Sequence, residues 1–244
     1  MTRILMIAGW GVLLASMVAV GLGRLRGKAG RVGRWGAGFS LSLLLLAWGY
    51  ESVRTGLPAF LSLFHLLLFL SMGLIAAWLL LRSSEPLLLF LGWALASLAL
   101  SPMAPPPSSA RPILLSAWLV LHVVTTAVGE VLLFVGAVLS LRRSSSDTTA
   151  STMEGLLRAG YGLFTLGALV FGAVWAFFAW GRFWGWDPKE TWSLIVWLWY
   201  TAYLHLPASL RRRTPFRLMP LVGALLLLFT LVGVPFLFRG LHSY

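Results

Sequence analysis

The sequence predicts an all-α fold: a polytopic integral membrane helix bundle of about eight transmembrane helices with a Trp-rich outer loop. Composition is the first reason. Of the 244 residues 59% are hydrophobic and 11% are charged, whereas soluble domains average roughly 45–50% apolar and about 25% charged residues. The second reason is that the apolar residues form runs near the roughly 20 residues that a helix needs to cross the hydrocarbon core. These features exclude a soluble globule and a disordered chain.

The charge balance and the cysteine count exclude further classes. Lys and Arg total 19 against 7 Asp and Glu, a formal net charge of +12. The basic residues are scattered between apolar runs, so we expect no nucleic-acid partner. The chain contains no cysteine, which excludes disulfides, thiolate metal sites and cysteine nucleophiles within it.

Eight apolar segments are predicted to be spans. The second and fourth are short for a membrane crossing. The first resembles a signal peptide, but basic residues and no A-x-A-like cleavage motif follow it, so we expect it to be retained. Gly160, Gly162 and Gly167 are expected to allow close packing between helices. The segments are residues 4–22, 36–53, 59–81, 86–102, 112–141, 159–180, 191–210 and 218–238.

The basic residues predict the orientation. If alternate loops share a side, 13 of the 19 basic residues lie on one side, and that excess identifies the cytoplasmic side. Residues 1–110 then form an N-terminal region of about four spans, and residues 111–244 form a second region of about four spans. With all eight spans, both termini, the loop 181–190 and the start of the fifth span face outside.

One outer segment, residues 175–192, is unusually aromatic. An interfacial belt of tryptophans explains two or three such residues, but not a cluster around a short turn. Asp187 suits the N-cap of the following helix, and Pro188 suits its first turn. The cluster favours a large, flat, apolar partner near the outer surface, such as a porphyrin. Its tryptophans are Trp175, Trp180, Trp184, Trp186 and Trp192.

The run WGRFWGWDPKETW resembles the tryptophan-rich "WWD" signature of haem-handling proteins. The Asp-Pro-Lys-Glu within it and the downstream Tyr203-Leu204-His205 resemble the CcsA (ResC) family, one half of the system II cytochrome c synthase. Leu121-His122-Val123 and the C-terminal His242 resemble the two outer histidines of that family. The resemblance covers the chain from about Trp118 onward. The N-terminal third departs from it, with Leu57-Pro58 and His65 at positions where the family often has other residues.

Histidines are the natural haem ligands here, because haem iron takes two axial ligands and the chain lacks cysteine. His122 and His242 are both predicted to lie on the outer side, where one porphyrin would sit between them, beside the Trp-rich loop. The residues expected to bind haem at or near this loop are Trp180, Trp184, Trp186, Asp187 and Trp192. Arg182, Lys189 and Arg239 are candidate partners of the haem propionates, with interfacial snorkelling as the alternative for each.

Two further histidines and Glu130 also stand in predicted spans. His205 lies roughly 22 Å along its helix from Glu190, too far to share an iron with His242. The resemblance implies a second, intramembrane haem site at His205, with the other ligand from a partner subunit. His65 is expected to pack or to form hydrogen bonds, with a role as second ligand as the alternative. Glu130 has no assigned role.

The resemblance implies a function. Haem b would be delivered across the cytoplasmic membrane and attached covalently to the CxxCH motif of apocytochrome c, with the haem-presenting face outside. It implies a CcsB/ResB-like membrane subunit as partner and thiol-reducing proteins that act on the apocytochrome. Three alternatives stay open: a CcmC-type haem exporter or chaperone, a b-type electron-transfer subunit, and a transporter with an aromatic gate.

Overall fold

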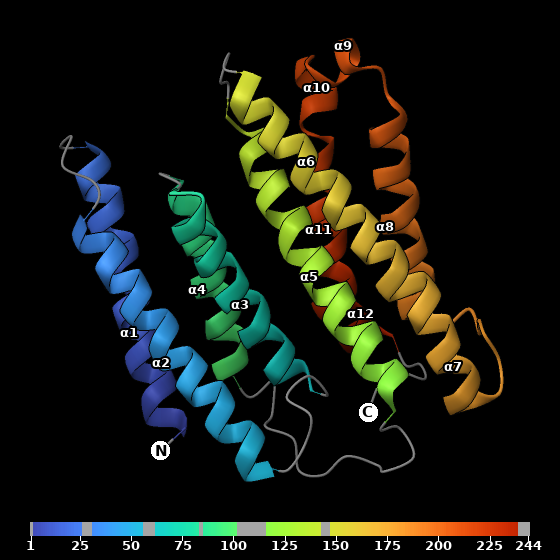
Figure 1. The fold of residues 1–244 in the computed structure, drawn as a ribbon, viewed down its shortest axis with the longest axis horizontal. Helices are drawn as coiled ribbons and strands as arrows, with labels where there is room; N and C mark the ends of the chain where they lie inside the picture. Colours follow the sequence, from blue (N-terminus) through green and yellow to red (C-terminus); the bar gives the residue numbers. More distant parts are fainter. Residues whose placement is uncertain are drawn as a thin grey trace. The chain divides into compact units, whose positions relative to one another are not determined.

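The computed structural model describes residues 2–25, 31–55, 62–82, 85–101, 116–142 and 147–238. Within these ranges the chain is helical and contains no strand. The chain divides into two compact units, Met1–Pro112 and Ile113–Tyr244. Each unit is a helical bundle (Figure 1), so the predicted all-α membrane fold class is confirmed.

The first unit consists of α1 (Thr2–Leu25), α2 (Arg31–Thr55), α3 (Leu63–Leu80) and α4 (Pro86–Leu100). α1 packs along α2 and α3 packs along α4, and α1 also contacts α4 while α2 contacts α3. Small residues let α1 and α2 approach closely. At this contact the Ser40 hydroxyl on α2 donates a hydrogen bond to the Gly9 carbonyl on α1 at 2.7 Å. A similar bond joins the other pair, from Ser71 on α3 to the Gly92 carbonyl on α4 at 2.7 Å.

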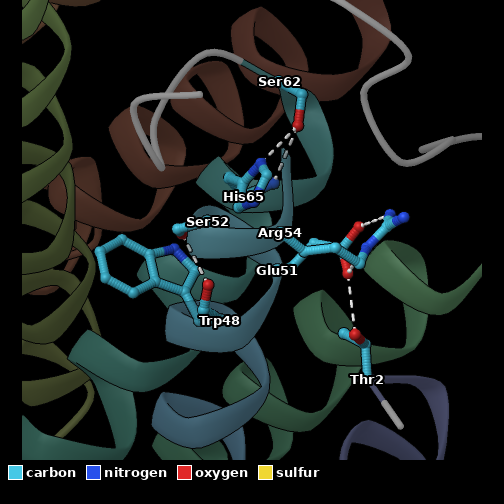
Figure 2. Close-up of polar contacts among 7 residues, drawn as sticks. All are labelled: Thr2, Trp48, Glu51, Ser52, Arg54, Ser62 and His65. Atoms are coloured by element: carbon cyan, nitrogen blue, oxygen red, sulfur yellow. Dashed lines mark hydrogen bonds and ion pairs between the residues drawn. The ribbon is translucent and has the colours of Figure 1, made fainter. Parts of the chain in front are cut away.

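Polar side chains from the start of α1, the end of α2 and the start of α3 form hydrogen bonds in this unit (Figure 2). The Glu51 carboxylate is 3% exposed as a residue and accepts a hydrogen bond from the Thr2 hydroxyl at 2.8 Å. The carboxylate also pairs with Arg54, one turn later on α2. These bonds tie the beginning of α1 to the end of α2. Nearby, the Ser62 hydroxyl caps α3 by accepting a hydrogen bond from the His65 amide.

The second unit is built on one long helix that changes its pitch. α6 (Asp147–Phe164), the π-helix η2 (Thr165–Phe171) and α7 (Gly172–Trp180) follow one another without a break and run along α5 (Ala117–Ser140). After a short loop, α8 (Pro188–His205) returns along α6 and η2. The chain ends in α9 (Ala208–Arg211), α10 (Thr214–Arg217), α11 (Met219–Leu228), η3 (Phe229–Gly233) and α12 (Val234–Leu237). α11 contacts both α5 and α8.

Glycines set the distance between α5 and the long helix. A Cβ added to Gly160 would lie 3.0 Å from the Gly129 oxygen, and one added to Gly129 would lie 2.8 Å from the Phe164 nitrogen. A Cβ on Gly167 would lie 2.5 Å from the Thr126 hydroxyl oxygen. The close packing predicted at Gly160 and Gly167 is therefore confirmed. The same prediction for Gly162 is wrong, because nothing lies within 4 Å of a Cβ at that position.

Each of the eight predicted segments overlaps a helix in the described residues, and three of them begin or end outside those residues. By length and composition, five helices there are apolar enough to cross a membrane: Thr2–Gly21, Leu63–Leu80, Ala117–Ser140, Thr149–Trp180 and Thr214–Leu237. α4 is apolar but shorter, while α2 and α8 carry charged residues at their ends. The protein is thus a multi-pass membrane protein. The count of eight spans and the orientation stay predictions.

Candidate functional site

His122 is held in one tautomer by the backbone of the long helix. Its Nδ1 lies 2.8 Å from the Gly167 carbonyl oxygen. A carbonyl only accepts hydrogen bonds, so Nδ1 must carry the proton and Nε2 of the neutral ring carries the lone pair. Histidines that ligate metals are oriented in the same way, by donating the other ring N–H to a carbonyl or carboxylate. His122 therefore has the protonation pattern that a metal at Nε2 requires.

The π-helix η2 brings the Gly167 carbonyl to this position. A π-helix bonds each carbonyl to the amide five residues later, and here the Gly172 amide bonds to the Gly167 oxygen. The wider turn occurs where two glycines face α5. A Cβ on Gly172 would lie 3.0 Å from His122 Nδ1. The imidazole fits beside the long helix because residue 172 has no side chain.

A wall of tryptophans adjoins the imidazole. The rings of His122 and Trp175 are parallel, with centroids 6.0 Å apart and an interplanar angle of 3°. Trp175 is buried, and Trp180 contacts it edge-on with centroids 4.7 Å apart. The half-buried imidazole thus packs beside an aromatic cluster built from the last two turns of α7.

The aromatic loop, residues 181–187, joins α7 to α8. Gly181 ends α7 with φ 75°, a left-handed conformation that glycine adopts without strain. At the other end Asp187 is buried, and its carboxylate accepts the Lys189 amide at 2.9 Å. Glu190 completes a capping box and Pro188 begins α8. The predicted roles of Asp187 and Pro188 at the start of this helix are confirmed.

The loop presents several aromatic rings at the surface of the unit. Trp186 is 70% exposed and Phe183 is 56% exposed. Trp184 is half-buried and meets Trp186 edge-on, with centroids 6.0 Å apart. Trp192 is placed differently, because its ring packs on Phe229 of η3 at 4.5 Å. The predicted tryptophans therefore separate into a group beside His122, a group on the loop, and Trp192 of α8, which packs against η3.

The basic residues of the loop have different surroundings. Arg182 is exposed, and its guanidinium lies over Gly185, where an added Cβ would be 2.9 Å from Arg182 Nε. Lys189 interacts electrostatically with Glu130, a 7%-exposed residue of α5. The two opposite charges attract, although no ion pair joins these two described residues. His242 and Arg239 lie outside the described residues.

His205 ends α8 and is exposed. Its Nδ1 donates to the Thr201 carbonyl at 2.8 Å. By the same argument as for His122, the lone pair of the neutral ring is on Nε2. The exposed position of the ring is compatible with a ligand or protein outside this chain.

A ladder of side-chain contacts, missed by the sequence reasoning, connects η2 and α6 with the end of α8. The Trp197 indole donates to the Thr165 hydroxyl at 3.0 Å, and the Tyr161 and Thr201 hydroxyls are 2.8 Å apart. The Tyr161 and Trp197 rings stack with centroids 6.0 Å apart. A signal was present: these polar or aromatic residues recur every four positions, at 161 and 165 and at 197, 201 and 205, on single helix faces.

His65 belongs to the first unit and is fully buried. Its Nδ1 lies 2.9 Å from the Ser62 hydroxyl, as Figure 2 shows. This is the packing and hydrogen-bonding role that the sequence predicts. The ring's Nε2 has no hydrogen-bond partner among the described residues.

Comparison with known proteins decides the family. The model of the cytochrome C assembly protein family matches residues 37–242, more than half of the chain. The chain belongs to the CcsA family of cytochrome c assembly proteins. The matched range includes His122, the aromatic loop and His205, and it also includes His242.

Three relatives, each named cytochrome c biogenesis protein CcsA, show the extent of the similarity. A Synechococcus protein is 38% identical over 192 residues, which cover 62% of this chain and 63% of the relative. A Prochlorococcus marinus protein is 32% identical over 254 aligned positions, covering 83% and 80%. The Gloeobacter violaceus protein is 45% identical over 108 residues, covering 43% and 31%. The match to the Synechococcus relative thus spans less than two thirds of its length.

Proposed function

We propose that this protein functions in cytochrome c biogenesis, by taking haem b to the outer face of the cytoplasmic membrane for covalent attachment to the CxxCH motif of apocytochrome c. It would act as one subunit of a cytochrome c synthase. Family membership supports the role in assembly. The observation that carries the haem part is the hydrogen bond from His122 Nδ1 to the Gly167 oxygen.

The residues around His122 fit a haem substrate in three respects. The imidazole is fixed in the tautomer with its lone pair on Nε2. Trp175 is buried and packs parallel to the imidazole, so it holds the ring in its orientation. The loop tryptophans offer exposed aromatic surface near the end of α7. In this proposal His242 supplies the second axial ligand and Arg182 and Arg239 pair with the propionates, while Lys189 is shared with Glu130.

In the attachment reaction the main task of this chain is to position the haem. Each thioether forms when a cysteine S–H of the apocytochrome adds across a vinyl C=C of the haem, so no further reactant is consumed. The residues of this chain hold the macrocycle so that vinyl groups and thiols meet, and they exclude water from its apolar faces. Thiol-reducing proteins keep the two cysteines of the apocytochrome in the reduced state that the addition requires.

A membrane partner of the CcsB/ResB type completes the proposal. His205 is exposed at the end of α8 with its Nδ1 already bonded to the Thr201 carbonyl. Its exposed ring leaves Nε2 accessible to a group from outside this chain. We assign it to a second haem site on the cytoplasmic half, with the other ligand from the partner subunit.

The test is a visible-absorption and haem-extraction assay on the complex, purified with its partner co-expressed. We expect wild type to carry haem and His122→Ala to lose it or to change its spectrum. Added imidazole should restore the wild-type spectrum if the lost group was a ligand, whereas a folding defect would not be rescued. His65→Gln, in the other unit, should keep the wild-type spectrum. Absence of haem from wild type would reject the proposal and favour the transporter.

A second assay separates attachment from chaperoning. The complex, reduced apocytochrome c and haem are combined, and covalently bound haem is measured after denaturation and acid extraction. Covalent product that depends on His122 supports the synthase. Haem bound without any covalent product would instead support the CcmC-type exporter.

A further inference from the structure

Trp186 has an unusual backbone conformation for its residue type. Its φ is 55°, and it is one of two non-glycine residues with positive φ in the described parts of the chain. A left-handed conformation forces the Cβ of an L-residue against its own backbone, and glycine or asparagine normally occupies such positions. The indole is 70% exposed, so burial of the ring does not compensate for this strain. Strain kept at an exposed aromatic residue indicates a function for the ring's placement.

The Glu190 carboxylate holds this conformation. A single oxygen, Oε2, accepts hydrogen bonds from the Gly185 amide at 2.8 Å and from the Asp187 amide at 3.1 Å. These are the amides on either side of Trp186. Successive N–H groups around a left-handed residue form a concave nest that binds an anion, and bonds to a carboxylate are stronger than neutral ones. Glu190 therefore fills the nest and keeps residue 186 left-handed.

Glu190 connects the aromatic loop to the fixed first turn of α8. Glu190 lies in the first turn of α8, whose start is fixed by the Asp187 cap. The carboxylate thus connects a rigid helix to the loop. Trp184 meets the Trp186 ring edge-on, at an interplanar angle of 85°. If the two amides were released, residue 186 would relax to an ordinary φ and its indole would move away from Trp184.

We propose that Glu190 is the positioning residue of the aromatic loop: through the Gly185 and Asp187 amides it sets the orientation in which the Trp186 indole receives haem. This inference rests on the proposed function, since it deepens the role of the same loop. It differs from a simple helix cap, because a cap stabilises α8 whatever residue stands at position 186.

A double-mutant cycle separates the two roles. Wild type, Glu190→Ala, Trp186→Gly and the double variant are prepared as the full complex, and haem loss to an excess of a haem-scavenging protein is followed by absorption. Glu190→Ala should accelerate haem loss about tenfold, because both charge-assisted hydrogen bonds that hold residue 186 are lost. In the Trp186→Gly background it should change the rate less than about twofold, because no indole remains to be misplaced. Equal effects in both backgrounds would overturn the proposal.

A haem-independent measurement applies the same logic to stability. In haem-free protein, Trp186→Gly should raise the Tm by about 2–4 °C when Glu190 is present, because glycine accepts a positive φ without strain. In the Glu190→Ala background this gain should vanish, since residue 186 has already relaxed. An equal gain in both backgrounds would show that Glu190 does not hold residue 186.

Two further variants complete the design. Glu190→Gln keeps an acceptor oxygen and should recover most of the haem retention that Glu190→Ala loses. Ser62→Ala removes a side-chain cap from α3 in the other unit and should leave the rate of haem loss unchanged. Haem-free wild type would reject the proposed function. In that case, a Tm gain from Trp186→Gly that requires Glu190 would still support the conclusion that Glu190 holds residue 186. A Tm gain that does not require Glu190 would overturn that conclusion as well.

Discussion

At the residue scale, one carbonyl defines the candidate site. The Gly167 oxygen fixes the tautomer of His122 across a separation of 45 residues in the chain. Two glycines make this possible, because a side chain at Gly167 would collide with Thr126 and one at Gly172 would crowd the imidazole, which would have to shift. The chemistry of the ring nitrogen is thus determined by residues that have no side chain.

Gly172→Ala tests this dependence. The new Cβ would lie 3.0 Å from His122 Nδ1 and 3.1 Å from Cε1, so the imidazole must move away from the Gly167 carbonyl. We expect destabilisation of about 1–3 kcal/mol and a changed absorption spectrum of bound haem, measured in thermal unfolding and by visible spectroscopy.

Gly162→Ala is the matched control on the same long helix. Its Cβ meets nothing within 4 Å, and alanine favours a helix over glycine by roughly 0.5–1 kcal/mol. This variant should be slightly more stable and spectrally unchanged. A spectrum for Gly172→Ala identical to wild type would contradict the role given to the Gly167 carbonyl.

At the element scale, the long helix makes two different kinds of contact with α5 because its pitch changes along its length. Its α6 part packs on α5 through glycines, and its η2 part turns a carbonyl toward His122. A second contact face, carrying Tyr161 and Thr165, meets α8. The π-helix therefore connects the surroundings of both candidate ligands, His122 and His205.

Thr165→Val tests the contact between η2 and α8. Valine removes the hydroxyl that accepts the Trp197 indole N–H at 3.0 Å. A half-buried donor left without a partner costs about 1–3 kcal/mol. We expect that loss of stability, together with a weaker haem signal from the His205 site. Thr165→Ser keeps the hydroxyl and should behave as wild type, and equal loss in both variants would point to packing instead.

Arg211 shows how the last turn of α8 is stabilised. Its guanidinium donates to the Leu204 carbonyl at 2.9 Å and to Glu154 of α6 at 3.2 Å, and the residue is 8% exposed. A cation at a helix C-terminus is favourable. Arg211→Gln should destabilise by about 1–3 kcal/mol. Arg213→Gln, an exposed neighbour, should change the unfolding midpoint little.

At the scale of the whole molecule, the distribution of charge predicts how the chain sits in the membrane. The aromatic loop is on the predicted outer side, and the basic segment at 211–217 is on the predicted cytoplasmic side. These two segments lie at opposite ends of α8, which is 18 residues long. A helix of this length rises roughly 27 Å, close to the thickness of the hydrocarbon core.

Because the chain has no cysteine, single introduced cysteines report this orientation directly. Phe183→Cys in the loop and Arg213→Cys before α10 both replace exposed residues. A membrane-impermeant maleimide should label the first in intact cells and the second only after lysis. The reverse pattern would invert the predicted orientation and exclude haem presentation on the outer side.

Features that local patterns encode can be predicted from the sequence alone. Apolar runs of helical length fix the membrane class, and the Asp187-Pro188 pair fixes where α8 begins, because caps act within one turn. The aromatic loop and the family resemblance likewise follow from contiguous residues. The sequence marked the segments of α2 and α4 as short, but it did not separate α8 from the five longer or more apolar spans.

The tertiary structure decided which distant groups meet. Nothing in the sequence near position 167 shows that its carbonyl would bond His122 on another helix. The close packing predicted at Gly162 was wrong for the same reason, because the neighbours of a glycine depend on which face of its helix packs against another helix. The left-handed Trp186 also depends on a carboxylate in the next helix. Helical periodicity determines faces, whereas the register between two packed helices is set by the side chains and glycines of both.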